Sequence, residues 1–400
     1  MKKTVILVSL FLFAGLIYGQ KTVDYLFKAK AFVKAGKPDD AVAILAEAIS
    51  LKQESRLYIE RAEAYISKGD YSQAINDLNL ANNMKPLSGE YGLSRIYALR
   101  GDAATALYHL ELNLNSPFKI SEKEVMLDPA FSVIENRPEW RQFWKKERYG
   151  SYEKAISEVE YYVSKGDIEE AKSILADLKR NYPDKDGNLY ATALISLKMA
   201  SFSEAVKTIN GLVVKYPDDE KYLRILARAQ EGAANPAGAS NTYTRLLELE
   251  VPDAEVLVLR AECYRKTGET AKALSDIEKY LDLYPYDKKS ISLAGKVVAA
   301  SGDNLKALDY FSRNLKLYPN DAECYIDRAN AYFVSRSWDV AIKDYSMALD
   351  LQPGNADVWL NKGIALLNSG KTTDACYDFR KSFSMGNKKA TEYISRNCIK

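Results

Sequence analysis

Apolar and small residues recur along this chain with a period of about 34 residues, separated by polar stretches. In the second half the prolines are spaced by 34, 35, 33, 34 and 34 residues. They are Pro183, Pro217, Pro252, Pro285, Pro319 and Pro353. Twelve residues before each proline stands a small residue, in order Ala171, Ala205, Ser240, Ala273, Ala307 and Ala341. A fixed period that carries several positions at once indicates stacked copies of one supersecondary unit.

Each unit is predicted to be a pair of helices joined by a tight turn. In residues 55–86, small side chains would let two helices approach closely, and the tyrosines and leucines would fill the space between units. These small residues are Ala62, Ala74 and Ala81. Lys-Gly-Asp turns follow the first helix at residues 68–70 and 165–167. Gly accepts the left-handed conformation that ends a helix, and Asp caps the next one. A proline ends the second helix because it cannot continue the hydrogen-bond ladder.

This arrangement resembles the tetratricopeptide repeat, a helix–turn–helix unit of about 34 residues. The matching residues in 55–86 are Tyr58, Ala62, Tyr65, Gly69, Tyr71, Ala74, Leu78, Ala81 and Pro86. Those in 322–353 are Tyr325, Ala329, Tyr332, Trp338, Ala341, Tyr345, Ala348 and Pro353. We count ten units, which begin near Thr22, Ser55, Leu87, Tyr152, Asp186, Lys221, Ala254, Lys288, Ala322 and Ala356. The resemblance implies an all-α fold, an α-solenoid superhelix of about ten helix–turn–helix repeats with a non-repeat helical insert.

The insert is residues 119–151, which do not fit the repeat but are rich in aromatic residues. Asp128-Pro129 and Arg137-Pro138 mark breaks before two predicted short helices. A similar Asp-Pro-x-Phe and Pro-x-Trp run closes repeat arrays in some bacterial members of the family. The segment is therefore a closing element for repeats one to three, or a degenerate repeat in a continuous superhelix. A third hypothesis makes it a docking surface, formed by Phe131, Trp140 and Trp144.

Residues 1–19 are predicted to be a cleavable signal peptide. Lys2 and Lys3 precede a nearly unbroken apolar run over 5–18, and Gly19 offers a small residue before a cut. The run is short for a permanent membrane helix, although an uncleaved anchor is the alternative. The first cysteine is Cys263, so no lipid-modified cysteine is expected after the run. We expect a periplasmic or secreted protein with no stable membrane span.

The chain is thus divided into five parts. They are the signal peptide (1–19), repeats one to three (20–118), the aromatic helical closing element (119–151), repeats four to ten (152–386) and a C-terminal capping helix (387–400). Lys388, Lys389 and Arg396 give the capping helix the polar outer face that the end of a solenoid requires.

Cys376 and Cys398 are predicted to form a disulfide in an oxidising compartment. Antiparallel packing of the last repeat's second helix and the capping helix would bring them together, and closing this loop stabilises by roughly 3 kcal/mol. Cys263 and Cys324 are two repeats apart, too far to bond in a regular stack. We expect them to be small buried hydrophobic residues.

Composition gives no support to nucleic-acid binding or catalysis. The formal net charge is +2, and removal of Lys2 and Lys3 takes it to zero, so no basic surface is expected. His109 is the one histidine, which leaves no histidine-based triad or two-histidine metal site. The sequence contains no phosphate-binding loop, dinucleotide glycine pattern or nucleophile elbow. We expect a non-enzyme without cofactor or metal.

In the resembling family, the first helices line a concave groove through their second, fifth, ninth and twelfth positions. Carried onto this sequence, these positions include Tyr91, Arg95, Glu160, Tyr190, Leu194, Tyr222, Ile225, Glu262, Arg265, Lys296, Asn330 and Phe333. A helix or extended peptide with an apolar face would suit such a groove. Any one of these side chains could instead be solvated or packed on a neighbour.

Chaperone-binding members of the family grip a C-terminal carboxylate over three units, and this chain matches that pattern only in part. Asn330 and Asn361 stand at the two asparagine positions, but Ile326 occupies the first lysine position. We therefore do not expect this activity.

Three functions remain open. The favoured one is a scaffold of the cell envelope that binds a protein or peptide partner in the groove. The alternatives are a self-associating structural protein, hence a homo-oligomer, and a binder of peptidoglycan or another glycan. A repeat fold by itself does not name the partner.

Overall fold

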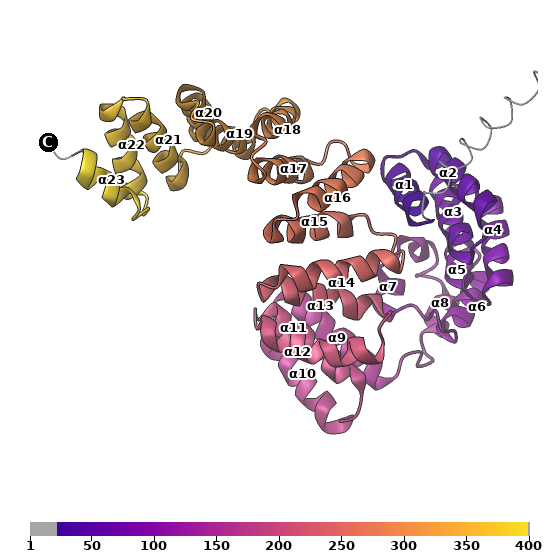
Figure 1. Cartoon of the computed structure of the whole chain (residues 1–400). Helices are drawn as coiled ribbons and strands as arrows, with labels where there is room; N and C mark the ends of the chain where they lie inside the picture. Colours follow the sequence, from indigo (N-terminus) through magenta and orange to yellow (C-terminus); the bar gives the residue numbers. More distant parts are fainter. Residues whose placement is uncertain (1–21, 399–400) are drawn as a thin grey trace, which may run out of the picture. The chain divides into compact units, whose positions relative to one another are not determined.

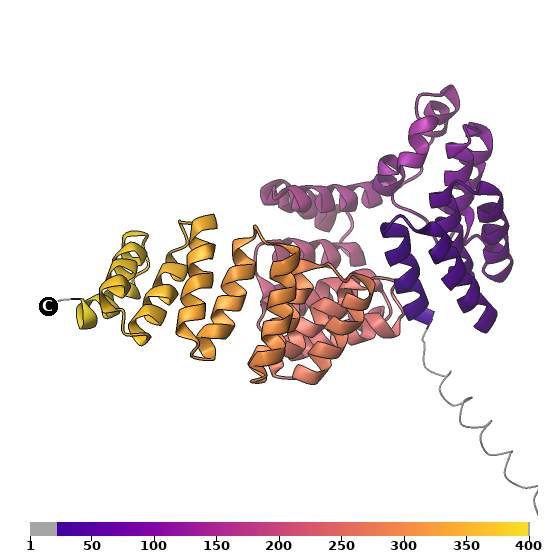
Figure 2. The same ribbon diagram turned by 90° about the horizontal axis from the view of Figure 1, so that it is seen from above.

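The computed structural model describes residues 22–398, which are helical with connecting turns and contain no strand. The predicted signal peptide lies outside the described residues. Figures 1 and 2 show the helices following one another as antiparallel pairs. No helix in the described part is both long and apolar enough to span a bilayer.

Ten helix pairs correspond to the ten predicted units. They are α1 (Thr22–Lys34) and α2 (Pro38–Leu51), α3 (Ser55–Lys68) and α4 (Tyr71–Met84), α5 (Glu90–Leu99) and α6 (Ala103–Leu114), α9 (Ser151–Lys165) and α10 (Ile168–Asn181), α11 (Asp186–Lys198) and α12 (Phe202–Lys215), α13 (Glu220–Gly232) and α14 (Pro236–Glu248), α15 (Glu255–Thr267) and α16 (Thr270–Leu283), α17 (Lys288–Ala300) and α18 (Asn304–Leu317), α19 (Ala322–Val334) and α20 (Trp338–Leu351), and α21 (Ala356–Asn368) and α22 (Thr372–Ser384). The third pair begins three residues later than predicted, because Leu87 adopts a left-handed conformation with φ of 69° and turns the chain before α5.

The chain divides into two compact units, one ending at Ala254 and the other beginning at Glu255. This boundary falls between the sixth and seventh repeats. Within the first unit, α1, α3 and α5 contact in succession, as do α9, α11 and α13; in the second unit α15, α17 and α19 do the same. Within each of these three runs the first helices of neighbouring repeats lie side by side, and we call the surface that they share the first-helix face.

Small residues allow the two helices of a repeat to approach, as predicted. Ala62, Ala74 and Ala81 are fully buried. Close approaches occur in the eighth repeat, where a Cβ on Gly295 would stand 2.4 Å from the Phe311 ring, and in the tenth, where a Cβ on Gly363 would stand 2.6 Å from the Phe379 ring. A position at which a large ring meets a glycine has no room for a side chain, so each of these pairs fixes the spacing of the two helices of its repeat.

Glycines end first helices where the sequence predicted tight turns. Gly69 and Gly166 have φ of 83° and 85°, in the left-handed region. Asp70 then caps α4 by accepting a hydrogen bond from the Gln73 amide at 3.3 Å. The same cap was expected from Asp167, but its carboxylate accepts no capping hydrogen bond. The prediction of an aspartate cap is therefore correct at one of the two turns.

A buried ion pair joins the two helices of four repeats and was not anticipated from the sequence. Arginine contacts aspartate through two nitrogens in Arg61–Asp77, Arg260–Asp276 and Arg328–Asp344, with distances of 2.7–2.8 Å. In the tenth repeat lysine replaces arginine, and Lys362 Nζ lies 3.3 Å from Asp378 Oδ2. Each pair has a sequence separation of 16 residues, so each lies inside a single repeat.

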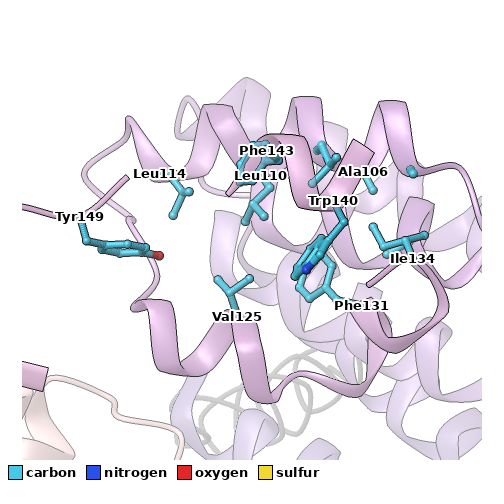
Figure 3. Packing of buried hydrophobic residues seen from close by; sticks show 12 residues of the cluster. Ala106, Leu110, Leu114, Val125, Phe131, Ile134, Trp140, Phe143 and Tyr149 are labelled. Carbon is cyan, nitrogen blue, oxygen red and sulfur yellow. The ribbon is translucent and has the colours of Figure 1, made fainter. Parts of the chain in front are cut away.

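The aromatic segment folds as α7 (Glu122–Leu127), the 3-10 helix η2 (Pro129–Val133) and α8 (Pro138–Phe143). The two predicted short helices do begin at the prolines of Asp128-Pro129 and Arg137-Pro138. Figure 3 shows their aromatic side chains gathered against apolar residues of α6. The buried cluster includes Ala106, Leu110, Leu114, Val125, Phe131, Ile134, Trp140, Phe143 and Tyr149. The segment thus covers the end of the third repeat.

The hypothesis that this segment presents an aromatic docking surface is wrong for two of its three residues. Phe131 is 2% exposed and Trp140 is 8% exposed, and their ring centroids lie 5.4 Å apart. Trp144 is half-buried against the same cluster. These rings are more stable in contact with one another and with α6 than in water, so they fill the core of the segment.

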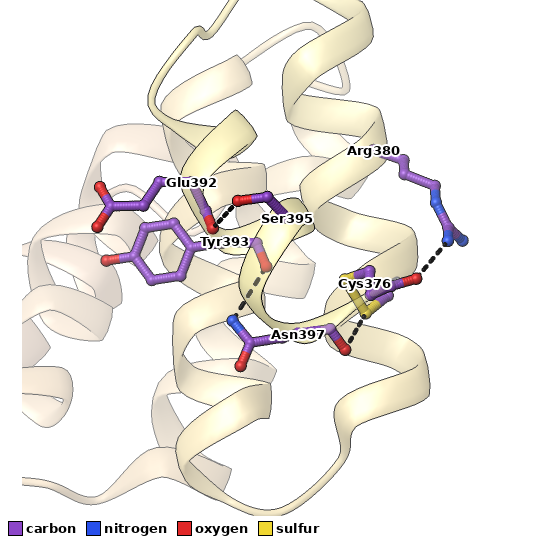
Figure 4. Close-up of a disulfide and its surroundings, with 7 residues drawn as sticks. Cys376, Arg380, Glu392, Tyr393, Ser395 and Asn397 are labelled. Atoms are coloured by element: carbon purple, nitrogen blue, oxygen red, sulfur yellow. Dashed lines mark hydrogen bonds between the residues drawn. A yellow bond between two sulfur atoms is a disulfide. The ribbon is translucent and has the colours of Figure 1, made fainter. Parts of the chain in front are cut away.

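The described chain ends with α23 (Ala390–Asn397), which is the predicted capping helix. A disulfide joins Cys376 of α22 to Cys398, with their Cα atoms 5.6 Å apart. Figure 4 shows Cys376 beside the C-terminal end of α23, next to Asn397. Cys263 and Cys324 are buried, as expected for small apolar residues.

Candidate interaction surface

Three residues predicted for the groove meet across three repeats of the first unit. The Tyr190 hydroxyl of α11 donates a hydrogen bond to Glu160 Oε1 of α9 at 2.8 Å. Lys221 Nζ of α13 donates to the same oxygen at 2.6 Å and lies 3.9 Å from the centre of the Tyr190 ring. The Tyr222 ring lies 6.0 Å from that of Tyr190. We call Glu160, Tyr190, Lys221 and Tyr222 the Glu160 cluster.

The Glu160 cluster has a buried base and an accessible rim. The Tyr190 side chain is 5% exposed, whereas that of Lys221 is 53% exposed. Burial, followed by the charge of Glu160, raises the pKa of the Tyr190 phenol well above its usual value. The phenol therefore remains protonated and keeps donating to Glu160 at physiological pH. The cluster can offer a fixed ammonium, a carboxylate and an aromatic edge, which are groups for recognition rather than for covalent chemistry.

Burial corrects two of the predicted contact residues. Tyr190 lies beneath Lys221, and Ile225 is 7% exposed. Neither side chain can be an open contact surface, because each is buried. Leu194 and Tyr222 remain half-exposed on α11 and α13. Lys221, which the prediction omitted, supplies the exposed charge; its place directly before Tyr222 was the available signal.

Tyr91 and Arg95, also predicted for the groove, instead hold the closing element. The Tyr91 hydroxyl donates to Asp128 Oδ2 at 2.9 Å, and Arg95 Nε lies 2.8 Å from the same carboxylate oxygen. Arg95 also pairs with Glu63 of the preceding repeat, at 2.5 Å. Burial and the hydrogen bond to Asp128 raise the pKa of Tyr91. Asp128 in turn accepts from the Ala130 amide at 2.9 Å and so caps η2. These contacts join two repeats to the aromatic segment.

In the second unit the predicted groove residues form shorter links. Glu262 and Arg265 pair with each other at 2.7 and 2.8 Å, and this pairing lowers the pKa of Glu262. Lys296, which is exposed, lies 3.0 Å from Asp327 of the next repeat. Asn330 and Phe333 also have partners in their own repeat: the Tyr345 hydroxyl donates to Asn330 Oδ1 at 2.7 Å, and the Trp338 ring lies 5.0 Å from that of Phe333. The predicted groove residues of this unit are thus already engaged with other side chains of the chain, through ion pairs, a hydrogen bond and a ring contact.

Within residues 22–398, no three His, Cys, Asp or Glu side chains are arranged so that they could hold a metal ion. His109 is half-buried, with its Nδ1 2.6 Å from Glu90 Oε2 and its ring stacked 5.4 Å from that of Tyr97. This histidine of α6 thus packs against α5 within the third repeat.

The comparisons with known proteins agree with the helix pairs. A family profile described as tetratricopeptide repeat matches residues 28–81, 225–288, 293–356 and 326–382. A second profile with the same description matches residues 151–185. Together these matches fall in both compact units.

Solved structures with similar folds include a tetratricopeptide repeat protein from Parabacteroides merdae. It has a TM-score of 0.52 and 22% sequence identity, and the match covers 62% of this chain and 99% of that one. The Cut9 and Hcn1 hetero-tetramer of the APC/C matches with a TM-score of 0.46 and 14% identity, covering 98% and 99% of the two chains. YrrB, described as a TPR protein with an unusual peptide-binding site, matches with a TM-score of 0.37, 17% identity, and 47% and 97% coverage. No curated protein sequence matches the chain significantly.

Proposed function

The chain belongs to the tetratricopeptide repeat family, and from this premise we propose that it is a non-catalytic scaffold of the cell envelope. It binds a peptide or helix of a partner protein on the first-helix face of its first unit. Tetratricopeptide repeat proteins bind protein partners, but their fold does not specify which one, so the site has to be argued from its own residues.

The Glu160 cluster is the observation that carries this proposal. Its charged and aromatic groups come from three successive first helices and are held in place by hydrogen bonds to one another. Groups fixed before binding lose little conformational entropy when a partner arrives. Tyrosine is among the residue types enriched at binding hot spots. Leu194 and Tyr222 supply half-exposed apolar area beside the charges.

The envelope location is proposed from two features of the chain. The basic start and apolar run of residues 1–19 are typical of an export signal. The Cys376–Cys398 disulfide is typical of proteins that fold in an oxidising compartment. Cell fractionation and the N-terminal sequence of the mature protein test this part, because cleavage before Gln20 is expected in a periplasmic or secreted fraction.

A photo-crosslinking experiment in intact cells tests the binding site. A photoreactive residue in place of Leu194 should capture a discrete protein partner, and the double change Lys221→Glu and Tyr222→Asp should abolish capture. Val214→Asp is the matched control, since Val214 is 84% exposed on the second helix α12 of the same unit. Capture should survive this control.

Two results would contradict the proposal. One is a captured partner that is equally abundant with the double variant. The other is crosslinking only between copies of this chain, together with a size in light scattering that rises with concentration. The second result would favour the self-associating function instead.

A further inference from the structure

A cavity of about 650 Å³ lies in the second unit between α21 of the last repeat and the capping helix α23. Most of its lining is polar, and its accessible apolar side chains are the half-buried Ile364 of α21 and Tyr393 of α23, since Leu360 is only 6% exposed. The volume is sufficient to admit a large apolar side chain with part of its backbone. This cavity is separate from the Glu160 cluster, which belongs to the other unit.

The charge around the cavity is positive. Lys388 and Lys389 lie on its rim, are exposed, and pair with no carboxylate in the described part of the chain. Glu392 also lines the cavity, but Arg396 neutralises it at 2.8 Å. The Asn361 amide lines the cavity as well and has no hydrogen-bond partner within residues 22–398. A mostly polar lining with unpaired cations, an unpaired amide and two accessible apolar side chains is complementary to an acidic segment that carries one apolar side chain.

One wall of the cavity depends on how α23 is attached. This helix has only eight residues, and an isolated helix of that length is not stable in water. It is held by Ala390, which is fully buried, and by Tyr393, whose ring stacks 5.0 Å from that of Phe379. At its other end, the disulfide ties Cys398 to Cys376 of α22 (Figure 4). Without this bond, the C-terminal end of α23 loses its covalent attachment to the last repeat.

We propose that this cavity binds an acidic peptide segment through one apolar side chain, and that the Cys376–Cys398 disulfide keeps the cavity formed. Lys388 and Lys389 contact the carboxylates of the peptide, while Ile364 and Tyr393 contact its apolar side chain. The site binds the peptide when the disulfide joins α23 to α22, and it does not bind the peptide when the disulfide is absent. It therefore adds a second, oxidation-dependent binding site to the scaffold.

Fluorescence anisotropy with a synthetic probe tests both parts on the full mature chain. The probe is the labelled peptide Asp-Glu-Asp-Leu-Asp-Glu-Asp, acetylated and amidated so that no terminal carboxylate contributes. Comparison peptides replace the acidic residues by Asn and Gln, or the leucine by Ser. We expect the probe to bind, and each comparison peptide to bind at least about tenfold more weakly, since each lacks one complementary group.

Three variants locate the site and test the role of the disulfide. Lys388→Glu with Lys389→Glu should weaken binding of the probe at least about tenfold. The matched control is Lys316→Glu with Lys343→Glu, two exposed lysines on second helices of the same unit, and it should bind like the wild type. Cys398→Ser should weaken binding to a similar extent as the rim variant, although its helical circular dichroism should remain close to that of the wild type.

The outcomes separate the two claims. Equal binding of the acidic and neutral peptides, or equal loss in the control lysine variant, would overturn the cavity as the site. Wild-type affinity of Cys398→Ser would overturn the role of the disulfide while leaving the site in place. The crosslinking test at Leu194 addresses the other unit, so failure of one proposal does not decide the other.

Discussion

The substitution Lys362→Arg should stabilise the last repeat and change its response to pH. Arg328 contacts Asp344 in the ninth repeat through two nitrogens at 2.7 and 2.8 Å. In the tenth repeat, Lys362 makes one contact of 3.3 Å with Asp378, and Asp378 Oδ2 is buried without a hydrogen bond. An arginine at this position could reproduce the two-point contact, because its planar guanidinium fits a carboxylate.

The size of the expected change in stability follows from the environment of Asp378. Burial raises the pKa of this carboxyl from 3.8 to about 6, and the nearby charge of Lys362 offsets only part of the rise. A carboxyl with a raised pKa binds its proton more tightly in the folded state than in the unfolded state. Stability is therefore lost as the pH rises from the unfolded value through the folded value. A rise of this size corresponds to roughly 3 kcal/mol between pH 4 and pH 6.

Two charge-assisted hydrogen bonds in place of one long contact should recover about 1 to 2 kcal/mol of this loss above pH 6. They should also lower the pKa of Asp378, because they stabilise the ionised carboxylate. Hydrogen exchange with mass spectrometry on α21 and α22 measures the local free energy of opening, which suits a repeat array that need not unfold as one unit. It would be recorded from pH 4 to pH 7 for wild type and variant.

Arg328→Lys is the matched control, since it converts the ninth repeat to the arrangement of the tenth. It should introduce a fall in the local stability of α19 and α20 between pH 4 and pH 6. The reasoning would be refuted if Lys362→Arg left the pH dependence of α21 and α22 unchanged, or if it destabilised them above pH 6.

Two further substitutions test packing and the closing element. Gly363→Ala should lower the thermal unfolding temperature, with a cost of about 1 to 3 kcal/mol, because its Cβ would stand 2.6 Å from Phe379. Gly354→Ala, where nothing lies within 4 Å of the added Cβ, should be nearly neutral in the same melt. Asp128→Ala should cost about 1 to 3 kcal/mol, because Tyr91 and the η2 cap lose their acceptor while Arg95 keeps its pair with Glu63. Its tryptophan fluorescence should shift to longer wavelength as the closing element loosens, and an unshifted spectrum would contradict this.

The repeat frame could be predicted because its signals are local. The period of the prolines and small residues places helix ends, and a helix end depends on residues within a few positions of it. The start of α11 at Asp186 and that of α21 at Ala356 fall on the predicted residues. The start of α5 does not, because the left-handed conformation of Leu87 has no strong sequence signal.

The candidate site could be predicted only in outline. Position within a repeat placed Glu160, Tyr190 and Tyr222 on successive first helices, but not the burial of Tyr190 beneath Lys221. A side chain of a first helix is buried when a side chain of another repeat covers it. The covering residue is 30 or more positions away in the sequence, so it cannot be identified from the pattern within one repeat. For the same reason, the contact of Tyr91 with Asp128 could not be read from either residue's own repeat.

The buried ion pairs have a consequence for how such an array can change its length. In each of Arg61–Asp77, Arg260–Asp276 and Arg328–Asp344, both partners belong to one repeat. A duplication or deletion of one whole 34-residue block therefore adds or removes the arginine and its aspartate together, and leaves no buried charge without its partner. The Glu160 cluster behaves in the opposite way, since Glu160 and Lys221 are 61 residues apart. Removing the block between them would leave an array that still folds but would destroy this surface. The number of repeats can therefore change without loss of folding, whereas the binding site requires that these three repeats remain adjacent.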